Sequence, residues 1–345
     1  MKKLQTSRIN EFFDAVAAQG RLYLPLENDS SVNFGVYAPG AKYDPTVLHT
    51  VKSAKDVFFP QCESMVSFMT KDKTFTVTPV APLEEQFTVF GVRACDVRGF
   101  ELLDKVFLTD PVDNFYAARR EHGTVISVAC AQPEETCFCG TFGIDMTAPG
   151  GDVRAFWTEE YVYFAPLTQK GTALLDSVAG LLEEADDTPA PVEEQRKEAQ
   201  SIMKKLPLAS LTTEGWGAGK LHEKFDRPEW ESLSESCLGC GTCTFVCPTC
   251  QCYDVQEFDT GKTVRRFRCW DSCMYSDFTK MSAGQPRPTQ VERFRQRFLH
   301  KLVYFPDNND GVFGCVGCGR CLQKCPIHMN IVKVINTLGG GAHEN

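Results

Sequence analysis

The residues best placed to do chemistry in this sequence are cysteines in two copies of one spacing, C-x2-C-x2-C-x3-C followed by proline. The first copy ends at Pro248 and the second ends at Pro326. Thiolates at this spacing ligate [4Fe–4S] clusters, and where two clusters are held, the fourth cysteine of each run binds the other cluster. A single C-x2-C pair would also suit zinc, but two full copies favour iron–sulfur clusters. The sequence therefore predicts a chain that carries electrons.

Crossed ligation divides these cysteines between two predicted [4Fe–4S] clusters. The ligands predicted for cluster 1 are Cys237, Cys240, Cys243 and Cys325. The ligands predicted for cluster 2 are Cys315, Cys318, Cys321 and Cys247. Glycines stand between ligands in both runs, where a side chain would hold the backbone N–H donors away from the cluster sulfurs. These glycines are Gly239, Gly241, Gly317 and Gly319.

Further cysteines follow two apolar runs in the first half of the chain. Cys95 follows the strand predicted for residues 87–92, and Cys130 follows the strand predicted for residues 124–129. Cys137 and Cys139 stand in the next loop. Because ligand sites of open α/β sheets collect beyond the carboxyl ends of strands, we expect these thiols to converge. We favour a third [4Fe–4S] cluster here; a zinc site and unligated cysteines remain the alternatives.

The long segment between the two cysteine runs, about 67 residues, carries another set of thiols. Its members are Cys250, Cys252, Cys269 and Cys273. They could bind a further metal, or they could be buried, reduced cysteines beside the clusters, and the sequence leaves both alternatives open. The helix predicted after this segment has an apolar face and several basic residues outside it. These residues, either solvated or placed to offset cluster charge, are Arg293, Arg295, Arg297 and Lys301.

Composition limits the partners and the location of the protein. The chain has 345 residues, enough for about two domains with hydrophobic cores. Its formal net charge of -9 argues against a nucleic-acid partner. Seventeen cysteines in ligand spacings favour metal binding in a reducing compartment over disulfides. No signal peptide and no apolar run of about 18 residues is recognisable, so we expect a cytoplasmic protein with no membrane partner.

Hydrophobic periodicity predicts the elements that position the cysteines. Apolar residues at helical spacing predict an amphipathic helix that ends before Gly20; they are Ile9, Phe12, Phe13 and Val16. Short apolar runs between turn-forming residues predict strands; they cover residues 22–26, 32–37, 74–80, 87–92 and 124–129. We also predict helices over residues 97–107 and 172–184 and a hairpin over residues 153–165.

An acidic stretch with two prolines, residues 183–194, predicts a linker between two domains. We therefore predict an α+β fold in three parts. A mixed α/β domain with the third cluster site covers residues 1–185, and a linker with a polar helix covers residues 186–205. A mainly helical, ferredoxin-like domain with two [4Fe–4S] clusters covers residues 206–345. No glycine-rich dinucleotide fingerprint and no P-loop appears, so we expect no flavin or nicotinamide to bind this chain alone, and we assign it no catalytic residue.

Several strings of this sequence resemble the iron–sulfur beta subunit of cytoplasmic NAD(P)-linked sulfhydrogenases. That protein is similar to one component of anaerobic sulfite reductase and to one component of flavin oxidoreductases that serve heterodisulfide-reductase-type complexes. The resemblance spans residues 87–330 and is carried by 90–96 (FGVRACD), 115–120 (FYAARR), 136–139 (TCFC), 247–252 (CPTCQC), 270–273 (WDSC) and 315–321 (CVGCGRC).

The resemblance implies a non-catalytic electron-transfer subunit of a multi-subunit oxidoreductase. Its implied partners are an FAD- and NAD(P)-binding flavoprotein subunit on one side and a hydrogenase, sulfite reductase or heterodisulfide reductase-type module on the other. Two alternatives remain. One is an iron–sulfur enzyme with its own substrate-binding cluster, and the other is a free ferredoxin-like carrier whose N-terminal domain docks partners.

Overall fold

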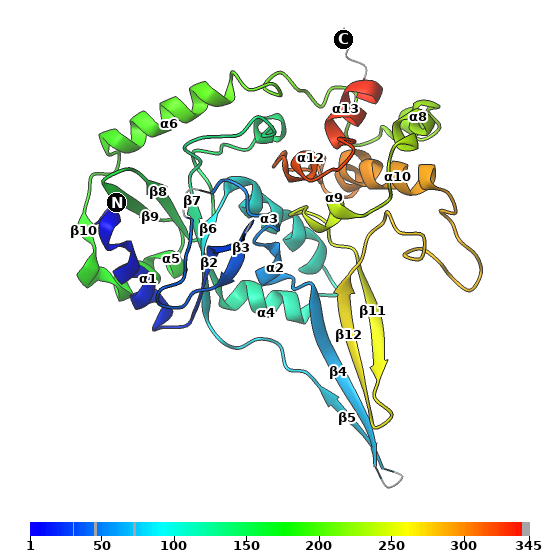
Figure 1. Ribbon diagram of the computed structural model, residues 1–345, viewed down its shortest axis with the longest axis horizontal. Helices are drawn as coiled ribbons and strands as arrows, with labels where there is room; N and C mark the ends of the chain where they lie inside the picture. Colours follow the sequence, from blue (N-terminus) through cyan, green and yellow to red (C-terminus); the bar gives the residue numbers. More distant parts are fainter. Residues whose placement is uncertain (30, 45–46, 72–73, 340–345) are drawn as a thin grey trace.

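An eight-stranded mixed sheet organises the first half of the chain, in the order β10-β1-β9-β8-β7-β6-β2-β3. The computed structural model describes all residues except 30, 45–46, 72–73 and 340–345 (Figure 1). The strands are β1 (Lys2–Gln5), β2 (Arg21–Asn28), β3 (Ser31–Val36), β6 (Phe87–Val92), β7 (Gly123–Val128), β8 (Val153–Trp157), β9 (Tyr161–Pro166) and β10 (Glu183–Glu184). The central strands β2, β6, β7 and β8 run parallel, and the remaining pairs are antiparallel.

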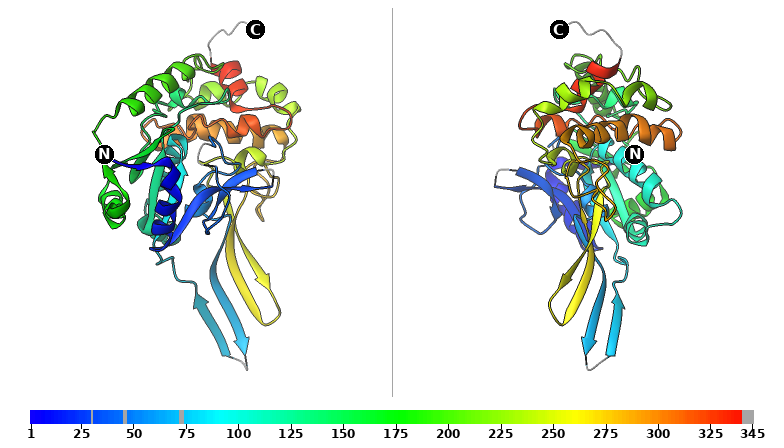
Figure 2. Two further views of the ribbon diagram at one scale, coloured as in Figure 1. Left: turned by 60° about the vertical axis from the view of Figure 1, so that its left-hand side comes forward. Right: turned by 90° about the vertical axis from the view of Figure 1, so that its right-hand side faces the viewer.

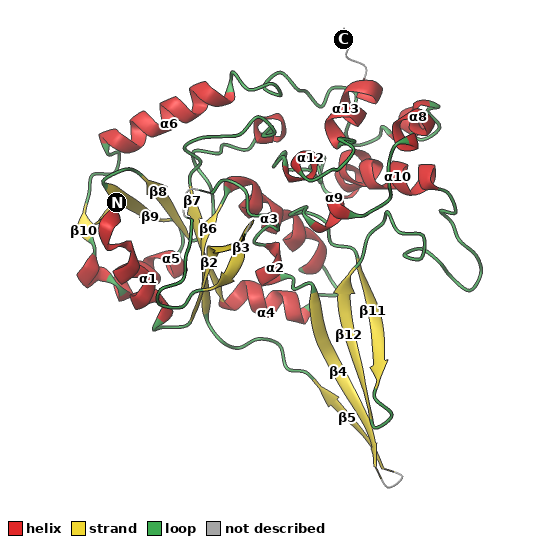
Figure 3. Ribbon diagram, viewed as in Figure 1, coloured by secondary structure: helices red, strands yellow, loops and turns green. Residues whose placement is uncertain are grey.

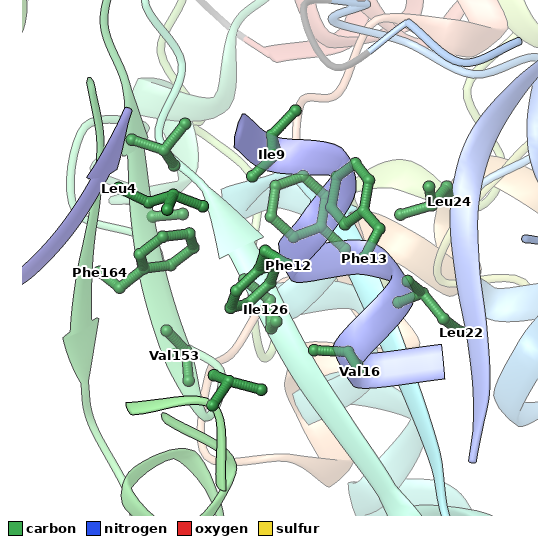
Figure 4. Packing of buried hydrophobic residues seen from close by; sticks show 14 of the residues in the cluster. Leu4, Ile9, Phe12, Phe13, Val16, Leu22, Leu24, Ile126, Val153 and Phe164 are labelled. Atoms are coloured by element: carbon green, nitrogen blue, oxygen red, sulfur yellow. The ribbon is translucent and has the colours of Figure 1, made fainter. Parts of the chain in front are cut away.

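Helices cover both faces of this sheet, which explains why β6 and β7 are continuous apolar runs. One face carries α1 (Ile9–Ala17) and α5 (Gln169–Ser177), whose apolar residues pack on β2, β7 and β9. Figure 4 shows Phe12, Phe13 and Val16 of α1 directed at these strands. The helices of the other face are α2 (Lys55–Phe58), α3 (Ala94–Phe107) and α4 (Asn114–His122). The predicted amphipathic helix is confirmed, since the four apolar residues that predicted it are buried.

Most of the elements predicted in this half are present, with shifted ends. The strands predicted for residues 87–92 and 124–129 are β6 and β7, and the hairpin over 153–165 is β8 and β9. The helix predicted for residues 172–184 is wrong in its second half, because α5 ends at Ser177. A 3-10 turn (Ala179–Leu181) and β10 follow, and the acidic side chains of β10 pair with Lys2 and Lys3 of β1.

The predicted linker is therefore ordered at both ends. Its first residues form β10, and its last residues begin α6 (Ala190–Met203), where Pro191 stands in the first turn. Figure 3 shows α6 as a long helix that leads from the sheet toward the C-terminal helices. Those helices are α7 (Leu221–Lys224), α8 (Glu229–Glu235), α9 (Thr242–Phe245), α10 (Gln290–Leu299), α11 (Phe305–Asn308), α12 (Arg320–Gln323) and α13 (Ile331–Gly339).

A core of its own holds the C-terminal helices together. Trp230 of α8 and Phe294 and Phe298 of α10 pack with the apolar face of α13. A π-helical turn, His300–Tyr304, joins α10 to α11 and places Leu302 in the same core. Among the described residues, no helix combines the length and the apolar character that a bilayer span requires.

A second sheet projects from the molecule as an arm (Figures 1 and 2). It has four antiparallel strands in the order β11-β12-β4-β5. Their bounds are β4 (Cys62–Lys71), β5 (Thr74–Pro79), β11 (Tyr253–Asp259) and β12 (Thr263–Trp270). The sequence analysis predicted β5 but not the β11–β12 hairpin. Because β12 pairs with β4, this sheet joins the first and last thirds of the chain, and the predicted division into domains 1–185 and 206–345 stays a prediction.

Candidate metal centres

The cysteines predicted as ligands of cluster 1 line one cavity, called here the first cavity. They are Cys237, Cys240, Cys243 and Cys325. Its other walls are mostly apolar and include Met274, Phe294 and Phe298. Three of the thiols come from the loop before α9 and from α9 itself, and the fourth comes from the loop after α12. The fold therefore brings together residues that are far apart in the sequence, in the combination that crossed ligation requires.

The cysteines predicted as ligands of cluster 2 line another cavity, called here the second cavity. They are Cys247, Cys315, Cys318 and Cys321. The two loops have matching local geometry. The N–H of Gly239 lies 3.5 Å from the Cys237 sulfur, and that of Gly317 lies 3.5 Å from the Cys315 sulfur. Backbone N–H groups directed at sulfur stabilise the negative charge of a thiolate or a cluster.

Arg297 lies between the two cavities, and its buried positive charge indicates that they hold negatively charged groups. Its side chain lines both of them and is only 3 % exposed. Nη2 is 3.5 Å from the carbonyl oxygen of Cys243, while Nε and Nη1 have no hydrogen-bond partner among the described residues. A buried guanidinium with unpaired N–H groups is unfavourable unless a negative charge lies beside it. The residues present therefore fit negatively charged clusters in both cavities.

Lys301 adds a second buried positive charge to the second cavity. Its Nζ donates to the hydroxyl of Thr249 at 2.6 Å and to the carbonyl of Gly314 at 3.1 Å. The sequence left open whether the basic residues near this helix are solvated or offset cluster charge. Because Arg297 and Lys301 are buried, the second interpretation is favoured for these two.

Burial raises the pKa of three of the four thiols of the second cavity, whereas interaction with Cys250 lowers the pKa of the fourth, Cys247. Burial raises the pKa of Cys315 to about 12 and that of Cys318 to about 11, although the cations Lys301 and Arg320 act in the opposite direction. The ligand form of cysteine is the thiolate, so these thiols need the additional positive charge of a metal to ionise.

The third site is the set of thiols predicted beyond the ends of β6 and β7. Its members, all at most 7 % exposed, are Cys95, Cys130, Cys137 and Cys139. Cys130, Cys137 and Cys139 pack in one buried cluster, and Cys95, in the first turn of α3, lies within electrostatic range of Cys130. The sequence analysis missed His49, whose Nε2 lies 3.9 Å from the Cys137 sulfur and whose Nδ1 lies 3.3 Å from Glu134. His49 is far in sequence from every cysteine run, so the sequence did not indicate that it lies beside these thiols.

The third site and the second cavity share a wall. The N–H of Phe138 donates to the carbonyl of Gly317 at 2.9 Å, and Phe138 lines the second cavity. A Cβ on Gly317 would lie 2.4 Å from the Phe138 carbonyl oxygen, so the two loops are in backbone contact. The three thiol sets therefore form a row, in which the second cavity lies between the third site and the first cavity.

A buried ion pair fixes the junction between these loops. Arg320 of α12 donates to Asp96 of α3 through two hydrogen bonds of 2.5 and 2.7 Å, and both side chains are 1 % exposed. The Arg320 Nε also donates to the carbonyl of Thr50 at 3.0 Å. The pair stands beside Cys95 and Cys321, one residue away from each, and so holds one ligand loop of the third site against the second cavity.

The cysteines between the two runs separate into two groups. Cys273 interacts electrostatically with Cys250 and Cys252, and Cys250 interacts in the same way with Cys247. Cys269 lies on β12 and stands opposite Cys62 on β4, away from the other three. Within the described part of the chain, no group of three or more His, Cys, Asp or Glu side chains is arranged to hold a single metal ion.

Crossed ligation has a measurable consequence. Cys325→Ser is expected to lower the iron content by about four atoms per chain and to leave the cluster of the second cavity in place, because each [4Fe–4S] cluster has its own set of four thiolates. Iron analysis and EPR of the anaerobically purified protein measure both effects. Cys62→Ser, at an exposed cysteine that lines neither the first nor the second cavity, is the control and should lose no iron. Retention of all iron in the Cys325 variant would contradict the assignment.

Comparison with known proteins places these features in a wider context. Residues 236–329 match the family of 4Fe-4S dicluster domains, a range that contains every cysteine of the first and second cavities. The whole chain is similar to the sulfhydrogenase 2 subunit beta of Pyrococcus furiosus, with 31% identity over 347 residues and 98% of each chain covered. No solved structure matches the chain significantly.

Proposed function

We propose, from the premise that the chain belongs to the family of sulfhydrogenase beta subunits, that it relays electrons between two other subunits. Its family and its dicluster domain make it an electron-transfer iron–sulfur subunit of an oxidoreductase complex. The donor that we propose is a subunit that binds FAD and NAD(P)H. The acceptor is a hydrogenase, sulfite reductase or heterodisulfide reductase-type module. We place the complex in the cytoplasm.

The observation that carries this proposal is the row of three thiol sets. When bound, [4Fe–4S] clusters supply one-electron redox chemistry, at potentials set by charge, hydrogen bonds and solvent exposure. The chain's own residues hold the sites next to one another. Phe138 and Gly317 keep the third site against the second cavity, and Arg297 is shared by the second and first cavities. We therefore propose a third [4Fe–4S] cluster on the cysteines of the third site.

Both ends of the row are accessible, as a relay between subunits requires. At one end, Cys240 is exposed, and Leu238, which stands between Cys237 and Cys240, is 67 % exposed. At the other end, a cavity of about 680 Å³ opens beside Cys130 and is lined by Ala129, Glu134 and Trp157. We propose that electrons enter and leave through these two ends.

The charged residues of the row act on the clusters without taking part in bond formation. Arg297 and Lys301 offset negative charge inside the protein, which favours the reduced state of a bound cluster. The apolar walls of the first cavity exclude water, which would otherwise weaken these electrostatic interactions. The chain thus supplies protected sites for electrons, while substrate chemistry belongs to its partners.

The test of this function compares the isolated chain with a reconstituted complex. The anaerobically purified chain with its clusters is expected not to oxidise NADH or NADPH with an artificial electron acceptor. Addition of the flavoprotein that co-purifies with it from native extracts should confer cluster reduction by NAD(P)H, followed as bleaching of the visible absorbance. Turnover of NAD(P)H by the chain alone would favour the enzyme alternative, and a stable monomer in native extracts would favour the free carrier; either result contradicts the proposal.

A further inference from the structure

Cys250, Cys252 and Cys273 form a compact thiol group that neither the two cavities nor the third site uses. The backbone brings Cys252 and Cys273 together, since the N–H of Asp271 donates to the carbonyl of Cys252, and Cys273 interacts electrostatically with both Cys252 and Cys250. Cys273 is 8 % exposed, and the other two are half-buried. This group is called here the fourth site. Its thiols come from two segments about 20 residues apart, so sequence proximity alone does not account for their meeting.

The base of the β11–β12 hairpin brings these segments together. Tyr253, the first residue of β11, stands opposite Trp270, the last residue of β12. The N–H of Asp271 then donates to the carbonyl of Cys252 at 3.0 Å, which closes the loop that carries the thiols. Ser272 is fully buried and its hydroxyl contacts that of Thr244 at 2.9 Å, so the backbone next to Cys273 is fixed.

A buried cation faces the fourth site. Lys55 of α2 is 2 % exposed, and its Nζ donates to the carbonyl of Cys250 at 2.8 Å. The same ammonium lies 3.6 Å from the centre of the Trp270 ring. A buried ammonium is unfavourable without a negative charge nearby, and its direct partners here are a carbonyl and an aromatic ring. Thiolates bound to a metal cluster would supply that charge.

The fourth site is also placed for electron exchange with the row. Cys250 follows Cys247 by three residues and interacts electrostatically with it, and Cys247 lines the second cavity. Cys269 cannot complete the set, because it stands on β12 opposite Cys62. The fourth site therefore has three cysteines of its own, on loops that the hairpin base and the buried Ser272 hold in place.

We propose that Cys250, Cys252 and Cys273 hold a fourth cluster of the [4Fe–4S] type, which branches from the relay beside Cys247. Three thiolates leave one iron without a cysteine ligand, unlike the clusters proposed for the two cavities and the third site. This open iron would accept a non-cysteine ligand, such as a carboxylate, a thiol of a partner protein or a small sulfur-containing molecule. The inference goes beyond the proposed function, since a relay between two partners needs only the row of three sites.

Metal analysis of matched variants tests the fourth site. Cys273→Ser is expected to lose about four iron atoms per chain, while Cys269→Ser, which alters a thiol outside the site on the same hairpin, should lose none. Cys252→Ser should behave like the Cys273 variant and replaces it if that variant does not fold. Retention of the EPR signals of the dicluster domain shows that each variant is folded. Unchanged iron in the Cys252 and Cys273 variants, or loss of zinc instead of iron, would overturn the proposal.

Mild oxidation of the unaltered chain provides a second measurement that needs no variant to fold. A cluster with an open iron gives up one electron to ferricyanide and releases one Fe²⁺, as [4Fe–4S]²⁺ becomes [3Fe–4S]⁺. We expect the EPR signal of a [3Fe–4S] centre in the unaltered protein and in Cys269→Ser, and no such signal in Cys252→Ser. Absence of the signal from the unaltered protein, or its persistence in the Cys252 variant, would overturn the assignment. Neither readout depends on NAD(P)H or on a partner, so a failure here is distinguishable from a failure of the proposed function.

Discussion

Replacing Arg320 by methionine is expected to lower the free energy of unfolding by about 3–5 kcal/mol, because the substitution leaves the carboxylate of Asp96 buried without a partner. Both side chains are 1 % exposed, and two hydrogen bonds join them. The midpoint of urea unfolding, followed by tryptophan fluorescence at matched iron content, measures the effect. Iron content should fall as well, since Asp96 follows Cys95 and Arg320 precedes Cys321.

A double-mutant cycle separates the ion pair from the rest of the junction. The double variant Asp96→Leu with Arg320→Met removes both charges and is expected to recover much of the lost stability, because apolar replacements of a buried pair are often close to neutral. Arg98→Ala, in the exposed pair Arg98–Glu101 of the same helix α3, is the matched control and should change stability far less. If the double variant were no more stable than Arg320→Met, the unpaired carboxylate would not be the cause.

The cysteine sets illustrate what local sequence could predict. Spacing and the prolines identified two runs, and the crossed rule assigned each cysteine to a set that the structure then places around one cavity. Cys95 and Cys130 were predicted to meet because both follow predicted strands, and ligand sites of open α/β sheets collect beyond the carboxyl ends of strands; the structure pairs these two strands in parallel. In each case the signal is contained in a short stretch of sequence, and the ligation itself awaits the metal analyses described above.

The features that the sequence analysis missed depend on contacts between distant segments. β11 is exposed along its whole length and rich in charged residues, and it forms a strand because β12 beside it pairs with β4, almost 200 residues earlier. Arg297 was not separable from its basic neighbours, since only the packing of α10 against both cavities buries it. Lys55 and His49 stand in segments without any motif, and their roles arise from tertiary contacts alone.

Gly317→Ala is the substitution expected to separate the third site from the second cavity. The residue has a φ of +60°, where an L side chain costs about 1–2 kcal/mol. Its new methyl group would also lie 2.4 Å from the carbonyl oxygen of Phe138 and 2.7 Å from the backbone nitrogen of Cys139, so backbone has to move. Overpacking of this kind costs about 1–3 kcal/mol, and together the two effects should lower the free energy of unfolding by about 2–5 kcal/mol.

Gly311→Ala is the control that separates the two effects of Gly317→Ala, the steric clash with the Phe138 loop and the backbone strain. Gly311 has a φ of +78° and no atom within 4 Å of the position of a new methyl group, so only the strain applies. We expect its urea midpoint to fall clearly less than that of Gly317→Ala, and its iron content to remain unchanged. The Gly317 variant should lose iron from both sites that meet at this residue, because the Phe138 loop carries Cys137 and Cys139 and the Gly317 loop carries Cys315 and Cys318. If the two substitutions changed the urea midpoint and the iron content equally, the Gly317 and Phe138 loops would not be in backbone contact. The proposed row would then lack the contact that joins the third site to the second cavity.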